Sequence, residues 1–185
     1  EYNWGYSSKL VKAIKNQDMK WIQTHKTGNV NCENWIVPRI LDMSAELTLN
    51  TAIKYGGYDY VKILIDRGAD VNKASRDLGI TPLIMSVSSG LNPDRYEVVE
   101  LLLENGADIK ENLEYVDIKH YNENYVYKLM GRSDAPIELI EQALAYDLDW
   151  SKIESLTGKS GIDIANESER EEVIELAIKS GHWDK

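Results

Sequence analysis

Two short segments of the 185-residue chain contain residue types that could hold an anion or a cation. The sequence GKS at residues 158–160 is similar to the end of a phosphate-binding loop, in which backbone N–H groups and a lysine surround the phosphate. That loop requires a glycine five residues before Gly158, and the chain has Ile153 there. The segment therefore does not predict a nucleotide site.

The second segment begins with Asp147, Asp149 and Ser151, which are spaced like the first ligands of a calcium loop. Lys152 stands where such a loop needs glycine, and Gly158 stands where it needs a bidentate glutamate. The pattern does not predict a calcium site.

His25 and Cys32 could supply two zinc ligands, but a zinc site needs three or four, and no second pair lies nearby in the sequence. Lys26 follows His25 where a zinc-protease helix would have glutamate. We therefore expect neither a metal nor another cofactor.

The charge of the chain excludes some partners. Twenty-one lysines and arginines against 31 aspartates and glutamates give a formal charge of −10. Such a surface repels phosphate backbones and anionic lipid headgroups, so we expect neither nucleic acid nor membrane as a partner. Residues 1–110 carry a net charge of −1 and residues 111–185 carry −9, so the acidity is concentrated in the C-terminal part.

No segment predicts a membrane span, because the longest uncharged stretch, Leu78 to Pro93, is short and contains two glycines and an internal proline. The single cysteine excludes an internal disulfide, and we expect a cytoplasmic location. The first residue is Glu1, which leaves secretion or a cleaved leader open.

Helical segments recur along the chain at intervals of 34 to 41 residues. EVVELLLENGADIK at 97–110 matches DYVKILIDRGADVN at 59–72 almost position for position. Related apolar patterns lie at 138–151 and 171–181, and a shorter predicted helix precedes each of the four copies, at 49–57, 82–90, 125–131 and 162–169. The pattern predicts stacked helix pairs.

Small and apolar residues recur at matching positions of these pairs. Ala52, Ser86 and Ala165 share one position, where a small side chain lets two short helices cross closely. The apolar residues expected to face the neighbouring pair are Val61, Leu64, Ile65, Val98, Leu101 and Leu102.

Glycine, threonine and proline mark the predicted helix ends. Gly68, Gly106 and Gly181 follow helices at positions that favour a left-handed backbone. Thr81 and Pro82 open a helix, where the missing N–H of proline costs nothing.

On these motifs, ITPLIMSVSSG at 80–90, GADVN at 68–72 and GADIK at 106–110, the sequence resembles the ankyrin repeat family. The resemblance implies an all-α solenoid of stacked helix-turn-helix pairs with loop or β-turn fingers. We expect one domain over 1–185, with approximate repeats at 7–40, 47–79, 80–117, 122–156 and 158–185. The fourth repeat departs from the pattern, with Asp147 for glycine and Trp150 for valine.

Catalysis by a nucleophile needs a base and an orienting group beside it. His25, His120 and His182 fall in three different repeats, so an elongated solenoid would keep them apart. We predict that the protein is not an enzyme; an enzyme with an unrecognised site is the alternative from another class.

Insertions that depart from the repeat are the candidate binding segments, because repeat positions are used for stacking. The insertion at 34–46 contains Trp35, predicted mainly to close the core, and that at 91–95 lengthens a turn. The insertion at 111–127 interleaves tyrosines with acids, as expected at an interface for a basic partner. Its predicted contact residues are Glu114, Tyr115, Asp117, His120 and Tyr121, whereas Tyr125 and Tyr127 are expected inside.

The more regular finger between repeats two and three adds further candidates. The resemblance implies that Lys73, Ser75, Arg76 and Asp77 point at the target.

These observations favour a protein-binding module that acts by occupying the surface of another protein, which we expect to be basic. A narrower hypothesis is an inhibitor or immunity-type protein that masks a basic enzyme or toxin. The alternative is an adaptor or a secreted bacterial or viral effector that recruits a host protein. We expect a monomer when the chain is free.

Replacing Tyr115 and Tyr121 by alanine should weaken binding to the partner without unfolding the chain, because tyrosine supplies large contact area in interfaces. Titration of the partner, with circular dichroism as the folding control, measures this. Unchanged affinity in the double variant would remove the insertion from the binding site.

Overall fold

The computed structural model describes residues 4–25, 30–31, 33–35, 45–75, 79–88, 92–109, 129–145, 159, 161–167 and 169–179. These residues are mostly helical, and the chain divides into two compact units, Glu1–Ala107 and Asp108–Lys185. The all-α repeat fold expected from the sequence is confirmed. The bounds of the individual repeats stay a prediction.

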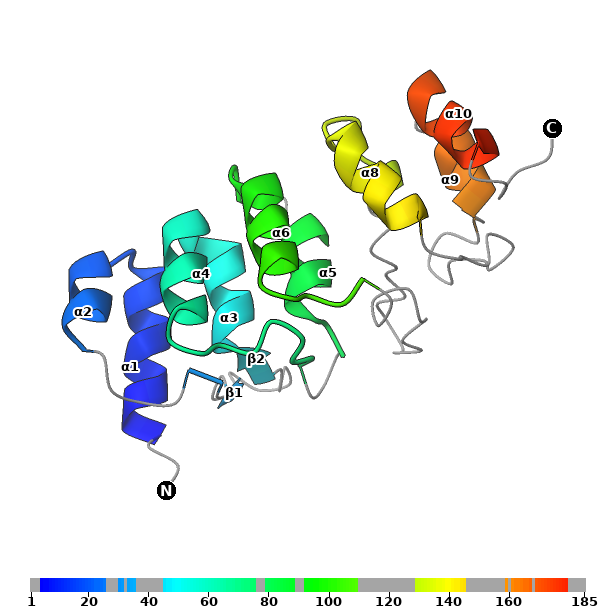
Figure 1. Ribbon diagram of the computed structural model, residues 1–185. Helices are drawn as coiled ribbons and strands as arrows, with labels where there is room; N and C mark the ends of the chain where they lie inside the picture. Colours follow the sequence, from blue (N-terminus) through cyan, green and yellow to red (C-terminus); the bar gives the residue numbers. More distant parts are fainter. Residues whose placement is uncertain are drawn as a thin grey trace. The chain divides into compact units, whose positions relative to one another are not determined.

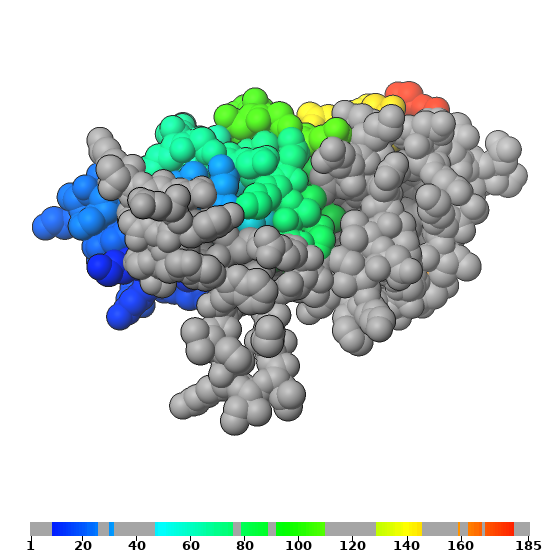
Figure 2. Space-filling view, turned by 90° about the horizontal axis from the view of Figure 1, so that it is seen from below, coloured from blue at the N-terminus to red at the C-terminus, as the bar shows by residue number. Residues whose placement is uncertain are grey.

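The described residues of unit 1 form three successive helix pairs, which Figure 1 shows side by side in chain order. The bounds are α1 Trp4–Lys15 with α2 Met19–Thr24, α3 Thr48–Thr51 continued by η1 Ala52–Gly56 with α4 Tyr58–Ile65, and α5 Pro82–Ser88 with α6 Arg95–Glu104. In the space-filling view of Figure 2, the described atoms of unit 1 follow the same order from blue through cyan to green.

Unit 2 contains α8 Ile137–Leu144, α9 Gly161–Glu167 and α10 Glu171–Lys179. Helix α10 packs against both α8 and α9. Leu129 and Met130, which precede α8, are helical and fully buried. Together these helices form the core of the unit as the structure describes it.

The predicted stacking residues are buried. Ala52, Ser86 and Ala165 each have no exposed surface, which confirms the small-residue position. Of the apolar set, Val61, Leu64, Val98 and Leu102 are fully buried, Leu101 is buried, and Ile65 is half-buried.

The helix ends also follow the prediction. Gly68 and Gly106 have φ of 82° and 87°, and after each glycine the next N–H donates back to a leucine carbonyl in the last helical turn. At the start of α5, the Ile84 N–H donates to Thr81 Oγ1 at 3.2 Å, so Thr81 caps the helix that Pro82 opens. Gly181 lies outside the described residues.

Asparagine side chains tie each turn to the next repeat. Asn31 Nδ2 donates to the Gly68 carbonyl at 3.0 Å, while Asn31 Oδ1 accepts from the Asp70 N–H at 2.6 Å. One repeat later, Asn72 Nδ2 donates to the Gly106 carbonyl at 2.9 Å. The same type of bond therefore fixes the spacing of two successive turns.

Two features of unit 1 differ from the regular pattern. The helix predicted at 49–57 widens into a π-helical turn over Ala52–Gly56, which ends where the Gly57 N–H donates to the Ala52 carbonyl. The insertion at 34–46 also contributes to a short antiparallel pair, β1 Glu33–Trp35 with β2 Ala45–Leu47. The side chain of Trp35, predicted to close the core, lies outside the described part.

Arg170 links α10 to the segment before α8. Its Nη1 donates to the Arg132 carbonyl at 3.1 Å and to the Ala135 carbonyl at 2.9 Å, and its Nε pairs with Glu172 at 2.9 Å. The arginine side chain is only 12% exposed. Replacing Arg170 would leave both carbonyls without their charged donor. We therefore expect Arg170 to contribute to the stability of unit 2.

Arg170→Met should lower the free energy of unfolding by about 2 kcal/mol, since hydrogen bonds to a charged group contribute about 1.5–3 kcal/mol. Urea unfolding followed by circular dichroism measures the change. Glu172→Gln is the matched control, because it removes the exposed ion pair and keeps the carbonyl bonds. Equal losses in both variants would contradict a role for the carbonyl bonds.

The ion pair between Glu172 and Arg170 should make stability depend on pH. The pKa of the Glu172 carboxyl is lowered from 4.5, first by a hydrogen bond from its own backbone N–H and then by Arg170. A lowered pKa in the folded state means that this contribution is present above pH 4.5 and is lost on acidification through the lowered pKa. Glu172→Gln should therefore weaken the loss of stability below pH 4.5.

Candidate protein-interaction site

Most of the contact residues predicted from the sequence lie outside the described part of the chain. They are Glu114, Tyr115, Asp117, His120 and Tyr121 of the insertion, and Arg76 and Asp77 of the finger. Tyr125 and Tyr127, expected inside, lie outside it as well. Their roles stay predictions.

Lys73 and Ser75 of the finger are described. Lys73 is half-buried, and its Nζ donates to the Asn31 carbonyl of the preceding repeat. Ser75 is 6% exposed, and its Oγ accepts from the Ile80 N–H at 3.1 Å. Its backbone N–H also donates to the Ile80 carbonyl at 3.0 Å. Ser75 thus closes the finger and presents little surface to a partner, whereas a contact by Lys73 stays untested.

The structure places four other acids along one side of α6. Asp94, Glu97, Glu100 and Glu104 follow one another at intervals of three, three and four residues, which aligns them on one helical face. All four residues are exposed. This acidic row had no counterpart among the predicted contact residues.

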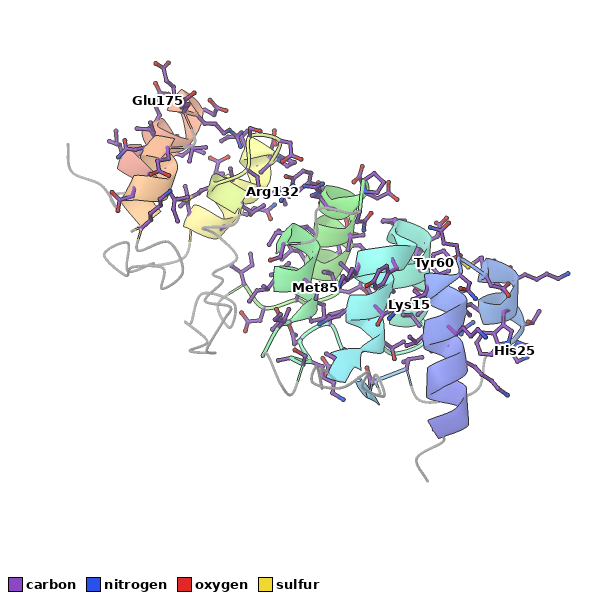
Figure 3. The ribbon with its side chains drawn as sticks, turned by 180° about the vertical axis from the view of Figure 1, so that it is seen from behind. Lys15, His25, Tyr60, Met85, Arg132 and Glu175 are labelled. Carbon is purple, nitrogen blue, oxygen red and sulfur yellow. The ribbon has the colours of Figure 1, made fainter. Side chains whose placement is uncertain are left out.

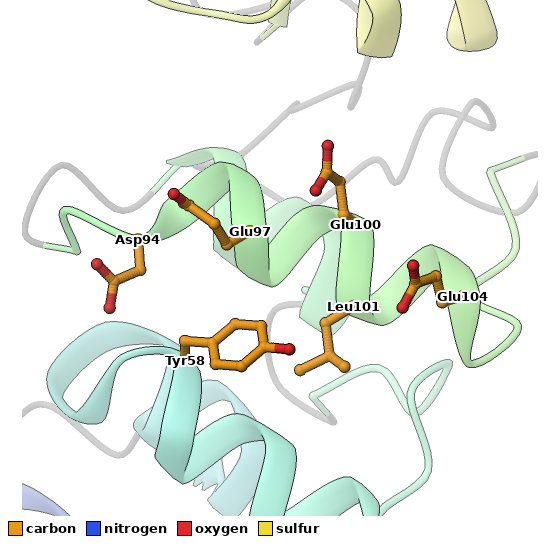
Figure 4. A pocket seen from close by; sticks show the side chains of 6 residues that line it. All are labelled: Tyr58, Asp94, Glu97, Glu100, Leu101 and Glu104. Carbon is orange, nitrogen blue, oxygen red and sulfur yellow. The ribbon is translucent and has the colours of Figure 1, made fainter.

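The acidic row borders a shallow groove between α4 and α6, which we call the acidic groove. Its volume is about 340 Å³, and its lining residues are Tyr58, Asp94, Glu97, Glu100, Leu101 and Glu104. Figure 4 shows the Tyr58 ring lying along α6, with its hydroxyl end directed toward Leu101. The groove therefore combines an aromatic ring with four carboxylates.

The turn at 92–94 holds one end of the acidic groove. Asn92 is 3% exposed; its Nδ2 donates to the Ile53 carbonyl at 3.1 Å, and its Oδ1 accepts from the Asp94 N–H at 2.9 Å. The Asp94 carboxylate makes no capping bond to α6. Asn92 is thus structural, and it anchors the turn that presents Asp94 at the edge of the groove.

Two other features are absent from the described residues. Nowhere in those ranges do three or more histidine, cysteine or acidic side chains come together as a metal site would require. Every described helix is too short or too polar to cross a lipid bilayer.

The repeated helix pairs, the glycine turns and the asparagine bonds agree with a comparison against family models. The model for ankyrin repeats, in three copies, matches residues 8–112, more than half of the chain. The chain belongs to the ankyrin repeat family. Ankyrin repeats are protein–protein interaction modules, and the family is typically non-enzymatic.

One curated relative also carries ankyrin repeats. Ankyrin repeat and MYND domain-containing protein 1 of Mus musculus is 35% identical over 79 residues, which is 43% of this chain. The match spans only 8% of the mouse protein. It therefore supports the repeat and not the activity of the whole relative.

The acidic groove could have been found in the sequence by a finer reading of charge. The net charge of −1 over residues 1–110 conceals it, because lysines elsewhere in those repeats balance the acids. The spacing of Asp94, Glu97, Glu100 and Glu104 was the available signal. Tyr58 belongs to α4 of the preceding helix pair, so only the packing of α4 against α6 brings the ring to this row.

Proposed function

We propose that this ankyrin-repeat chain is a non-enzymatic binding module that occupies the surface of a basic partner protein through the acidic groove. The observation that carries the proposal is the alignment of four exposed carboxylates beside Tyr58. Because the four carboxylates are exposed, lysine or arginine side chains of a partner can reach them without any rearrangement of α6.

The four carboxylates of the acidic groove contribute only modestly to affinity. An exposed ion pair contributes about 0.2–1 kcal/mol, so four pairs supply at most a few kcal/mol. Charge of this kind raises the rate of encounter and selects a basic surface more than it sets affinity. The flat ring of Tyr58 offers additional contact, because a lysine or arginine over an aromatic face is attracted to it. The groove thus favours a partner that carries several basic side chains.

The narrower proposal is masking: an inhibitor or immunity-type protein that silences a basic enzyme or toxin in a one-to-one complex. The insertion at 111–127 carries tyrosines and acids, which are residue types suited to such an interface. An adaptor that recruits one protein to another is the alternative, and it predicts two separable partners.

We further propose a free monomer, and the single cysteine favours a reducing compartment such as the cytoplasm.

The experiment compares the wild-type chain with Glu97→Gln/Glu100→Gln/Glu104→Gln as baits in affinity capture from the native source at low salt. The wild type should retain a basic protein at one-to-one stoichiometry. The triple variant should bind that protein at least about tenfold more weakly, a loss of about 1.4 kcal/mol, because three carboxylates of the groove become neutral. Titration of the purified protein measures the difference.

The matched control is Glu138→Gln/Glu141→Gln/Glu175→Gln, which removes the same charge from exposed positions of α8 and α10. Figure 3 labels Glu175 on α10. The control should bind nearly as well as wild type. Equal weakening in both variants would show that total charge matters instead of the groove, and unchanged binding in the first variant would exclude the groove.

An activity assay of the captured protein separates the two narrower readings. Silencing in the one-to-one complex supports masking. A captured protein that keeps its activity and joins a second partner in a ternary complex supports recruitment.

A further inference from the structure

Tyr55 and the lysines beside it form a second surface of unit 1. The charge of this surface is opposite to that of the acidic groove. At 36% exposure it is the one large apolar or aromatic side chain among the described residues that is exposed rather than buried or half-buried. Lys15 Nζ lies 5.1 Å from the centroid of its ring, and Lys54 Nζ lies 5.2 Å from it. Two ammonium groups therefore flank one exposed ring, and we call these three residues the basic tyrosine patch.

The patch extends along α1. Lys9 and Lys12 are exposed and precede Lys15 at intervals of three residues, so they lie on neighbouring turns of one helical face. Figure 3 shows Lys15 at the end of α1 beside the cyan helix α3. In the described part of the chain, Lys54 has no carboxylate within ion-pair distance. Four lysines therefore surround this surface, with the exposed Asp18 close to Tyr60 at its edge, although the chain as a whole carries −10.

Unusual backbone holds Tyr55 in place. It lies in the π-helical turn, where the neighbouring Gly56 packs so closely on Tyr60 that an added Cβ would come within 2.7 Å of the tyrosine Cβ. Gln17, which has a φ of 55°, donates from Nε2 to the Tyr55 carbonyl at 3.5 Å. π-Helical turns and left-handed non-glycine residues are uncommon, and both concentrate at functional sites. Here both support one exposed side chain.

We propose that the basic tyrosine patch binds a short acidic segment of a second partner protein. Carboxylates of such a segment would pair with Lys15 and Lys54, while its backbone or apolar atoms cover the ring of Tyr55. A short segment meets mainly the local field, because exposed charges farther away than about 8 Å are largely screened at physiological salt. An extended polyanion such as nucleic acid or an anionic bilayer would also meet the acidic remainder of the molecule.

The patch would give unit 1 two surfaces of opposite charge. The acidic groove selects a basic partner, and the basic tyrosine patch selects an acidic one. The patch shares no residue with the acidic groove, so it can be tested while the groove is intact or neutralised.

The test is fluorescence anisotropy of a fluorescein-labelled decaglutamate peptide titrated with the full chain at low salt, with decaglutamine as the neutral peptide. Decaglutamate should bind saturably and decaglutamine should not. Lys15→Gln/Lys54→Gln should weaken decaglutamate binding about tenfold, because two cations are removed. Tyr55→Leu, which keeps both lysines, should also weaken decaglutamate binding. If circular dichroism shows that the double lysine variant does not fold, Tyr55→Leu serves as the test on its own.

The matched control is Lys62→Gln/Lys179→Gln, which removes two exposed lysines from α4 and α10. This control should bind decaglutamate as the wild type does. Absence of saturable binding, or equal weakening in the control, would overturn the proposal.

Three other ligands of the basic tyrosine patch would give different results with the wild type and Lys15→Gln/Lys54→Gln. Binding of single-stranded RNA or of phosphatidylserine vesicles that Lys15→Gln/Lys54→Gln abolishes, without decaglutamate binding, would replace the acidic segment by a polyanion or a membrane. Concentration-dependent dimerisation in sedimentation that this variant abolishes, again without decaglutamate binding, would show that a second copy covers the patch. Each of these results would overturn the proposal.

Discussion

In unit 1, successive helix pairs bury their apolar sides against one another. Leu64 and Leu102 occupy matching positions of successive pairs, and both are fully buried. The turns after these helices are joined by side-chain amides, since Asn31 bonds to the Gly68 carbonyl and Asn72 to the Gly106 carbonyl. Stacking therefore fixes both the apolar contacts and the spacing of the turns, and a single pair has neither by itself.

This constraint determines where function can lie. Because the apolar faces are used in stacking, the surfaces proposed for recognition consist of side chains that stacking leaves at least partly exposed. In unit 1 these form the acidic groove beside Tyr58 and the basic tyrosine patch around Tyr55, both held by residues with structural roles. Asn92 anchors the turn at one end of the groove, and the π-helical turn fixes the ring of the patch.

Regular positions could be predicted from the sequence, and irregular ones could not. Gly68 and Gly106 have the expected left-handed backbone, and the shared small position of Ala52 and Ser86 is buried, because the repeat imposes one geometry on matching residues. The bonds of Arg170 join segments 35 and 38 residues apart, which spacing alone does not encode, and the repeat pattern predicts an ordinary helix where the π-helical turn lies. The acidic groove was missed for the same reason, since α4 supplies its ring and α6 its acids.

If the acidic groove selects its partner by charge, the association rate will depend on ionic strength at that groove. The measurement is stopped-flow association of the chain with its purified basic partner, from low to physiological salt. The rate constant for the wild type should fall about tenfold or more with added salt, while dissociation changes little. In Glu97→Gln/Glu100→Gln/Glu104→Gln the dependence on salt should be much shallower. An association rate of the wild type that is indifferent to salt would contradict recognition by the groove.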